Sequence, residues 1–101
     1  MIYIFHLLDK PDSSALRQRA RPEHKAYLAG VAERIAFAGP LLGPDGQTML
    51  GSLLAIDFDT PQAAADWLAN EPFTKAGLYA DSQSHGFSNL WPQRAGFPPA
   101  A

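Results

Sequence analysis

The 101-residue sequence contains no cysteine, only three histidines and few charged residues. Without cysteine there is no disulfide framework, no thiolate metal site and no cysteine nucleophile. Charged residues make up 18% of the chain, below the usual ~25%, whereas apolar residues make up 47%. This composition excludes disorder of the whole chain, because disordered proteins have few apolar and many charged residues.

An excess of charge of one sign and long hydrophobic runs are missing as well. The 8 Lys and Arg residues nearly balance the 10 Asp and Glu residues, so the chain lacks the basic surface that nucleic-acid-binding proteins carry. No apolar run approaches the ~18 residues that span a bilayer, and the first residues lack the basic segment of a signal peptide. The sequence therefore predicts a single-domain cytoplasmic protein that binds neither nucleic acid nor membranes.

Apolar patterning and turn signals predict the element order β-α-β-β-α-β. Strands are expected at residues 2–8, 41–42, 49–58 and 82–90, and helices at 14–38, 61–69 and 73–78. Within the first helical stretch, Pro22 is expected to start a second helix, and Gly39-Pro40 to end it. Thr60 and Pro61 form a helix start, and Pro72 breaks that helix.

This order is that of the ferredoxin-like α+β fold, with the helices on one face of the sheet. Both alternating sets of side chains in residues 2–8 are apolar, so both faces of that strand need cover. In so short a chain a second copy is the simplest cover, and we expect a homodimer with sheet packed on sheet. We expect one domain over residues 1–95 and a loosely held tail over residues 96–101.

His24 and Glu71 are the candidate catalytic residues. His24 lies on an apolar helical stripe close to the expected helix start, where the helix dipole favours the neutral imidazole that a general base needs. Glu71 lies at the break after the second long helix, where a carboxylate can orient a histidine or exchange a proton. We expect the two side chains within hydrogen-bond reach or one bridging water of each other. The alternatives are a core histidine and an N-cap for the helix after Pro72.

The candidate substrate-binding residues are Arg19, Arg21, Ser52 and His6. Arg17, Arg19, Arg21 and Lys25 put four cations within nine residues, which suits an anionic ligand, although a solvated helix face is the alternative. Gly51 before Ser52 indicates a close backbone approach or a bulge. His6 lies in the first strand, where a structural histidine is the alternative. No residue spacing matches a nucleotide or metal motif, so we expect no metal and no cofactor.

Several short motifs resemble those of the YciI-like (YCII-related) family. The matching segments are Arg21-Pro22-Glu23-His24 for its R-P-x-H segment, Ala38-Gly39-Pro40-Leu41 for its A-G-P segment, Gly51-Ser52 before an apolar strand, and Glu71-Pro72-Phe73-Thr74-Lys75-Ala76-Gly77-Leu78 for its D-P-[FY]-x-x-A-G-L segment. The resemblance covers about residues 1–91. It implies a ferredoxin-like fold that dimerises into an α+β barrel without a cofactor. It also implies a site built on His24 and on Glu71, which replaces the family's usual Asp.

Three functions remain open at this point. The first is an enzyme with lyase, isomerase or hydrolase activity, which uses His-carboxylate acid–base chemistry on small, often ring-shaped organic molecules, as the resemblance implies. The second is a dimeric binding or regulatory module that captures a small-molecule ligand without converting it. The third is an interaction domain whose sheet face serves to dimerise.

Overall fold

The computed structural model describes residues 1–98, so residues 99–101 of the expected tail lie outside the described part of the chain. The elements, in chain order, are β1 (Ile2–Asp9), α1 (Ser14–Ala29), the 3₁₀ helix η1 (Ala32–Arg34), β2 (Ile35–Leu42), β3 (Met49–Asp57), α2 (Pro61–Ala69), α3 (Pro72–Lys75) and β4 (Tyr79–Phe87). The sheet order is β2-β3-β1-β4, and all neighbouring strands are antiparallel. The predicted ferredoxin-like fold is confirmed.

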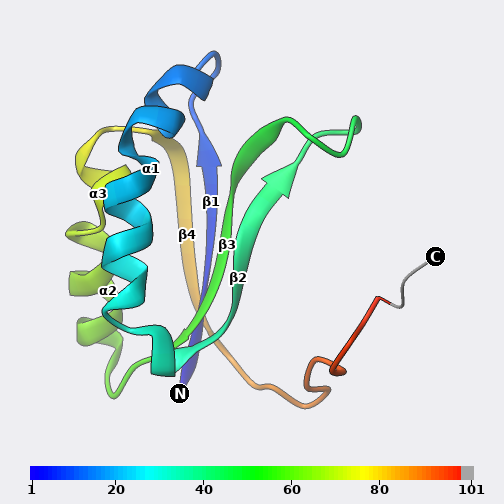
Figure 1. Ribbon diagram of the computed structural model, residues 1–101. Coiled ribbons are helices and arrows are strands. Elements are labelled where there is room, and N and C mark those ends of the chain that lie inside the picture. Colours follow the sequence, from blue (N-terminus) through cyan, green and yellow to red (C-terminus); the bar gives the residue numbers. More distant parts are fainter. Residues whose placement is uncertain (99–101) are drawn as a thin grey trace.

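The helices lie together on one face of the sheet (Figure 1). On β1 the buried side chains are Tyr3, Phe5 and Leu7, which alternate with partly exposed neighbours as a strand with one covered face requires. Trp67 of α2 stacks on Phe5, with ring centroids 5.9 Å apart, and joins helix and sheet in one core. No helix of residues 1–98 covers the opposite sheet face, so Ile4 stays partly exposed there.

Helix α1 runs without a break through Pro22, so the predicted start of a second helix there is wrong. A proline inside a helix removes one backbone hydrogen bond. Here tertiary contacts hold the helix on both sides of the proline, since Arg17 and His24 are both buried against other elements. Packing therefore overrides the local preference against helix at this position.

The predicted helix to residue 38 is also wrong, because α1 ends at Ala29 and residues 35–42 form strand β2. Val31 and Ile35 continue the apolar stripe and do pack against the core, but from the turn and the strand. Pro40, expected to stop a helix, lies in β2 opposite Ser52. Since β2 is an edge strand, a proline without an N–H is tolerated there.

Several local predictions are confirmed. The Thr60 hydroxyl accepts a hydrogen bond from the Ala63 N–H, which caps α2. A side chain at Gly51 would clash with the backbone carbonyl of Leu7, so the close approach of two strands explains this glycine. Gly77 follows the end of α3 with φ of +75°, a conformation that glycine adopts without strain. The last strand starts at Tyr79 and ends at Phe87, earlier than predicted.

Candidate active site

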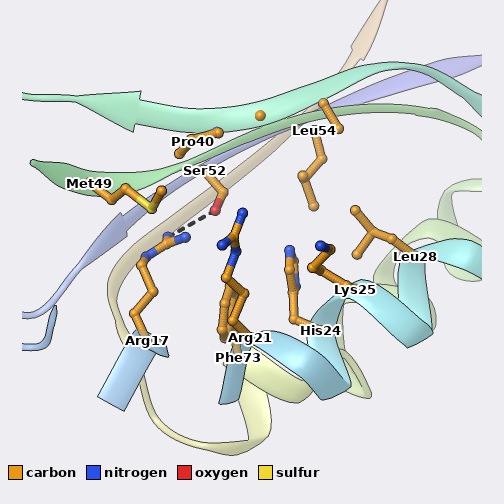
Figure 2. Close-up of a pocket in the computed structure, with 12 residues that line it drawn as sticks. Arg17, Arg21, His24, Lys25, Leu28, Pro40, Met49, Ser52, Leu54 and Phe73 are labelled. Carbon is orange, nitrogen blue, oxygen red and sulfur yellow. Dashed lines mark hydrogen bonds between the residues drawn. The ribbon is translucent and has the colours of Figure 1, made fainter. Parts of the chain in front are cut away.

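A cavity of about 290 Å³ lies between α1 and the strands β2 and β3. Its lining residues are Arg17, Arg21, His24, Lys25 and Leu28 from α1, Ala38, Gly39 and Pro40 from β2, Met49, Ser52 and Leu54 from β3, and Phe73 from α3. Figure 2 shows the basic side chains of α1 rising toward an apolar wall made by the strands. A mostly apolar cavity with a few convergent polar groups is the usual form of a small-molecule site.

His24 and Glu71 are in direct hydrogen-bond contact through His24 Nδ1 and Glu71 Oε1. The contact follows from the topology: β1 and β3 are antiparallel, so the helices that follow them, α1 and α2, run in opposite directions. The end of α2 therefore returns to the middle of α1. His24 lies in the second half of α1, so the prediction that the dipole at the helix N-terminus favours its neutral form is wrong. The group in contact with the imidazole is instead the Glu71 carboxylate.

Glu71 is fully buried, and hydrogen-bond partners contact both of its carboxylate oxygens. The N–H of Phe73 donates to Oε1 at 3.1 Å, and the N–H of Thr74 donates to Oε2 at 3.2 Å, so Glu71 is the N-cap of α3. The Tyr79 hydroxyl donates to Oε2 at 3.2 Å. The N-cap and the histidine partner, which the sequence leaves as alternatives, are thus the same side chain.

Tyr79 extends this buried network. Burial, followed by the negative charge of Glu71, raises the pKa of the Tyr79 hydroxyl well above its usual value. The hydroxyl therefore stays protonated and remains a donor to the carboxylate. Tyr79 comes into reach at the point where the register between β1 and β4 shifts, beside Asp9. This register shift has no signal in the sequence.

Arg17 forms the other buried polar group of the site. Its Nε donates to Asp9 Oδ2 at 2.7 Å and its Nη2 to Asp9 Oδ1 at 3.0 Å, which is a two-bond ion pair. The same Nη2 donates to the Ser52 hydroxyl at 2.9 Å. The guanidinium also lies 4.8 Å from the centre of the Phe73 ring, on which His24 stacks at 3.9 Å between ring centroids. Phe73 thus fixes both side chains.

The structure brings together four of the six candidate residues. His24, Arg21 and Ser52 line the cavity, and Glu71 lies directly behind His24. Arg19 lies instead beside a separate surface hollow between α1 and α3. His6 occupies the sheet face away from the helices, as its pairing opposite Leu53 and its parity with Ile4 require.

Sequence reasoning missed four residues of the site. The sequence places Arg17 and Lys25 in the basic cluster without assigning them to the site, and it gives no signal for Asp9 and Tyr79. The four-residue spacing of Arg17, Arg21 and Lys25 is the signal that would have found the first two, because it places them on one side of a helix.

Within residues 1–98, no group of three or more His, Asp or Glu side chains is arranged to hold a metal ion. In the same part of the chain, no helix combines the length and apolar character that crossing a membrane requires. The polar groups that line the cavity are instead the His24 imidazole, the Ser52 hydroxyl and the cations Arg17, Arg21 and Lys25, and the buried Glu71 carboxylate lies behind His24. Such a set can move a proton and bind a negatively charged group.

The sequence is similar to known proteins over most of its length. Residues 1–87 match the family model of the YCII-related domain. An uncharacterised protein of Haemophilus influenzae is 33% identical over 88 residues, covering 80% of this chain and 90% of that protein. Protein YciI of Escherichia coli is 31% identical over 86 residues, covering 78% of this chain and 88% of that protein.

One solved structure is similar over most of its length. It is the 5-chloro-2-hydroxyhydroquinone dehydrochlorinase TftG of Burkholderia phenoliruptrix, in complex with 2,5-dihydroxybenzoquinone. The TM-score is 0.80 at 29% sequence identity, and the match covers 87% of this chain and 94% of that one. Residues 1–87, which match the family model, contain every helix and strand described above and with them the cavity.

Proposed function

The chain belongs to the family of YCII-related domains, and on that premise we propose that it is an enzyme of acid–base chemistry acting on a small, ring-shaped organic molecule. His24 transfers the proton, and Glu71 holds the imidazole in place. The substrate occupies the cavity beside α1. The reaction is of the lyase, isomerase or hydrolase type, and the proposal assigns no cofactor.

The contact between His24 and Glu71 is the observation that carries the proposal. With Nδ1–H donating to the carboxylate, the neutral imidazole has its free lone pair on Nε2, at the opposite edge of the ring. His24 lines the cavity, so Nε2 is the nitrogen that a bound molecule can reach. The negative charge of Glu71 then stabilises the imidazolium that forms when Nε2 takes a proton. A positioned base of this kind contributes about 10²–10⁴-fold to a rate.

The size of the cavity and the solved relative support the substrate class. A cavity of about 150 Å³ is enough for a benzene ring, so about 290 Å³ accommodates a ring with several substituents. TftG is a dehydrochlorinase whose structure contains a hydroxylated six-membered ring. Loss of hydrogen chloride is an elimination in which a base removes a proton and chloride leaves, which is the chemistry that a histidine–carboxylate pair can serve.

The proposed activity is tested by measuring whether the protein removes protons from, or adds them to, hydroxylated rings. We would incubate chlorinated and unchlorinated hydroxyhydroquinones with the protein in D₂O, and measure chloride release by ion chromatography and deuterium uptake by mass spectrometry. The wild type should exceed His24→Gln by about 10²–10⁴-fold in at least one reaction. Gln keeps an N–H donor for Glu71, and His85→Gln is the matched control, because His85 is exposed and pairs opposite Ile4 on the sheet face away from the cavity.

Two results would count against catalysis. Equal rates for the wild type and His24→Gln would exclude His24 as the base. Binding of the rings without chloride release or deuterium uptake would instead favour the non-catalytic ligand-binding module.

We also propose that the protein is a homodimer in the cytoplasm, joined through the sheet face that lacks helices. Ile4 and Leu53 of that face are partly exposed, and Phe87 at its edge is 40% exposed. A second copy would cover these apolar groups. The domain assignment, residues 1–95, stays a prediction alongside the dimer.

A further inference from the structure

We infer that the cavity is built for an organic anion, and that Arg21 and Lys25, the exposed cations of its lining, bind the negative group. This inference rests on the proposed function and specifies its substrate class: a compact molecule with a carboxylate or an ionised ring hydroxyl. It assigns to ligand binding Lys25, which the sequence places in the basic cluster but not among the candidate substrate-binding residues.

The first observation is a stripe of positive charge on α1. Arg17, Arg21 and Lys25 follow one another at intervals of four residues, so they lie on one side of the helix, and all three line the cavity. Among the ion pairs within residues 1–98, only Arg17 of these three has a partner, Asp9. Two cations four residues apart repel each other, so the unpaired Arg21 and Lys25 are stabilised when an anion lies between them.

The second observation is that Arg17 is already engaged. Its guanidinium is bound to the Asp9 carboxylate and the Ser52 hydroxyl, and it lies over Phe73. Arg17 is therefore a buried, already neutralised part of the cavity wall, and Arg21 and Lys25 are the cations left to bind a negatively charged group. An arginine offers a planar pair of donors to an oxygen anion, and a lysine adds a mobile point charge.

The third observation is the asymmetry of the cavity walls. Pro40, Met49 and Leu54 of the strands face the basic side chains of α1 across the cavity (Figure 2). A ligand with a hydrocarbon body and one anionic edge fits this arrangement: its body packs on the strands and its charge faces α1.

His24 lies between these two cations in the sequence and shares the cavity with them. When its Nε2 removes a proton from a bound molecule, the negative charge left on that molecule develops close to Arg21 and Lys25. Fixed cations beside a developing negative charge lower the energy of the transition state. The same pair therefore binds an anionic substrate and stabilises the more negative intermediate.

The experiment compares acids with neutral amides of the same shape. Isothermal titration calorimetry would measure binding of benzoate and salicylate against benzamide and salicylamide. The proteins are the wild type, Arg21→Gln, Lys25→Gln, and the matched controls Arg94→Gln and Lys75→Gln, which remove the same charges at exposed positions outside the cavity. At least one acid should bind more than tenfold more tightly than its amide. Arg21→Gln and Lys25→Gln should each weaken acid binding about tenfold, and leave amide binding and both controls unchanged.

Three results would overturn the inference: no acid of the panel binds, acids and amides bind alike, or the controls weaken acid binding as much as the cavity variants do. The outcome is separable from that of the proposed function, because His24→Gln keeps both cations. If His24→Gln binds the acids like the wild type but neither protein moves a proton, the anion site stands and the catalytic proposal fails. If proton transfer depends on His24 while charge has no effect on binding, the anion site fails alone.

Discussion

Replacing Glu71 tests whether one carboxylate supports both the fold and the proposed catalytic histidine. Glu71→Ala removes the acceptor of two backbone N–H groups, of the Tyr79 hydroxyl and of His24 Nδ1, all of them in or next to the core. The loss of an N-cap costs about 0.5–2 kcal/mol, and each buried donor left without a partner costs about 1–3 kcal/mol. Because neighbouring losses overlap, we expect the free energy of unfolding to fall by about 3–5 kcal/mol. A domain of this size has about 5–15 kcal/mol in total.

Glu71→Gln is the sharper variant because it keeps the shape. Its amide oxygen can replace Oε1, which accepts from His24 and from the Phe73 N–H. Its NH₂ group then replaces Oε2, where it can donate to Tyr79 but opposes the N–H of Thr74. We therefore expect a smaller loss of about 1–2 kcal/mol in the free energy of unfolding. Activity should fall by at least tenfold, but less than in His24→Gln, because the neutral amide no longer stabilises an imidazolium.

Urea denaturation followed by the fluorescence of Trp67 in the core measures both variants, at one fixed protein concentration because a dimer would make stability concentration-dependent. Glu33→Gln, at an exposed position of η1, is the matched control and should change little. The reasoning is refuted if Glu71→Ala is as stable as Glu33→Gln, or if Glu71→Gln keeps full activity while His24→Gln loses it.

Three further predictions concern the surroundings of the site. Arg17→Gln leaves Asp9 buried without its cation and should lower the free energy of unfolding by about 3–5 kcal/mol in the same urea assay; a change no larger than that of Arg94→Gln would contradict the buried ion pair. Ile4→Lys places a charge on the open sheet face and should give a folded monomer in sedimentation equilibrium, whereas a wild type that is monomeric at micromolar concentration would refute the proposed homodimer. The raised pKa of Tyr79 means that the folded protein holds the hydroxyl proton more tightly than the unfolded chain does. The free energy of unfolding should therefore decrease as the pH rises above about 10, where the unfolded chain loses this proton. Tyr79→Phe should be about 1 kcal/mol less stable at pH 7 and should lose stability less steeply above pH 10, and equal slopes would contradict the assignment.

The fold was largely predictable because its determinants are local. The apolar residues 2–8 and 49–58, the cap at Thr60 and the break before Pro72 each specify an element, and their order specifies the ferredoxin-like arrangement. The errors lie where tertiary contacts decide. Residues 35–38 are predicted as the end of a helix because Val31 and Ile35 continue a helical stripe, yet pairing with β3 makes them part of strand β2.

The site was predictable in part for the same reason. The contact of His24 with Glu71 follows from the antiparallel direction of two helices, which the element order already contains. The contacts of Arg17 with Asp9 and Ser52 do not, because they depend on side-chain directions across a strand end and a register shift. The candidate Arg19 lies outside the cavity for a simple geometric reason. It is two positions from Arg21 on a helix, which turns its side chain to another side of α1, beside a different hollow of the surface.

The central claim is that Glu71 holds His24 with Nε2 free to act as a base. The most direct measurement is ¹⁵N NMR of the histidine side chains, at a pH where the imidazoles are neutral, with His6 and His85 as internal references for the ordinary tautomer mixture. We predict that His24 carries its proton on Nδ1, that Nε2 is unprotonated, and that Glu71→Ala returns the ring to the ordinary mixture. A proton found on Nε2 in the wild type would contradict the account, since that nitrogen then has no lone pair with which to accept the substrate's proton.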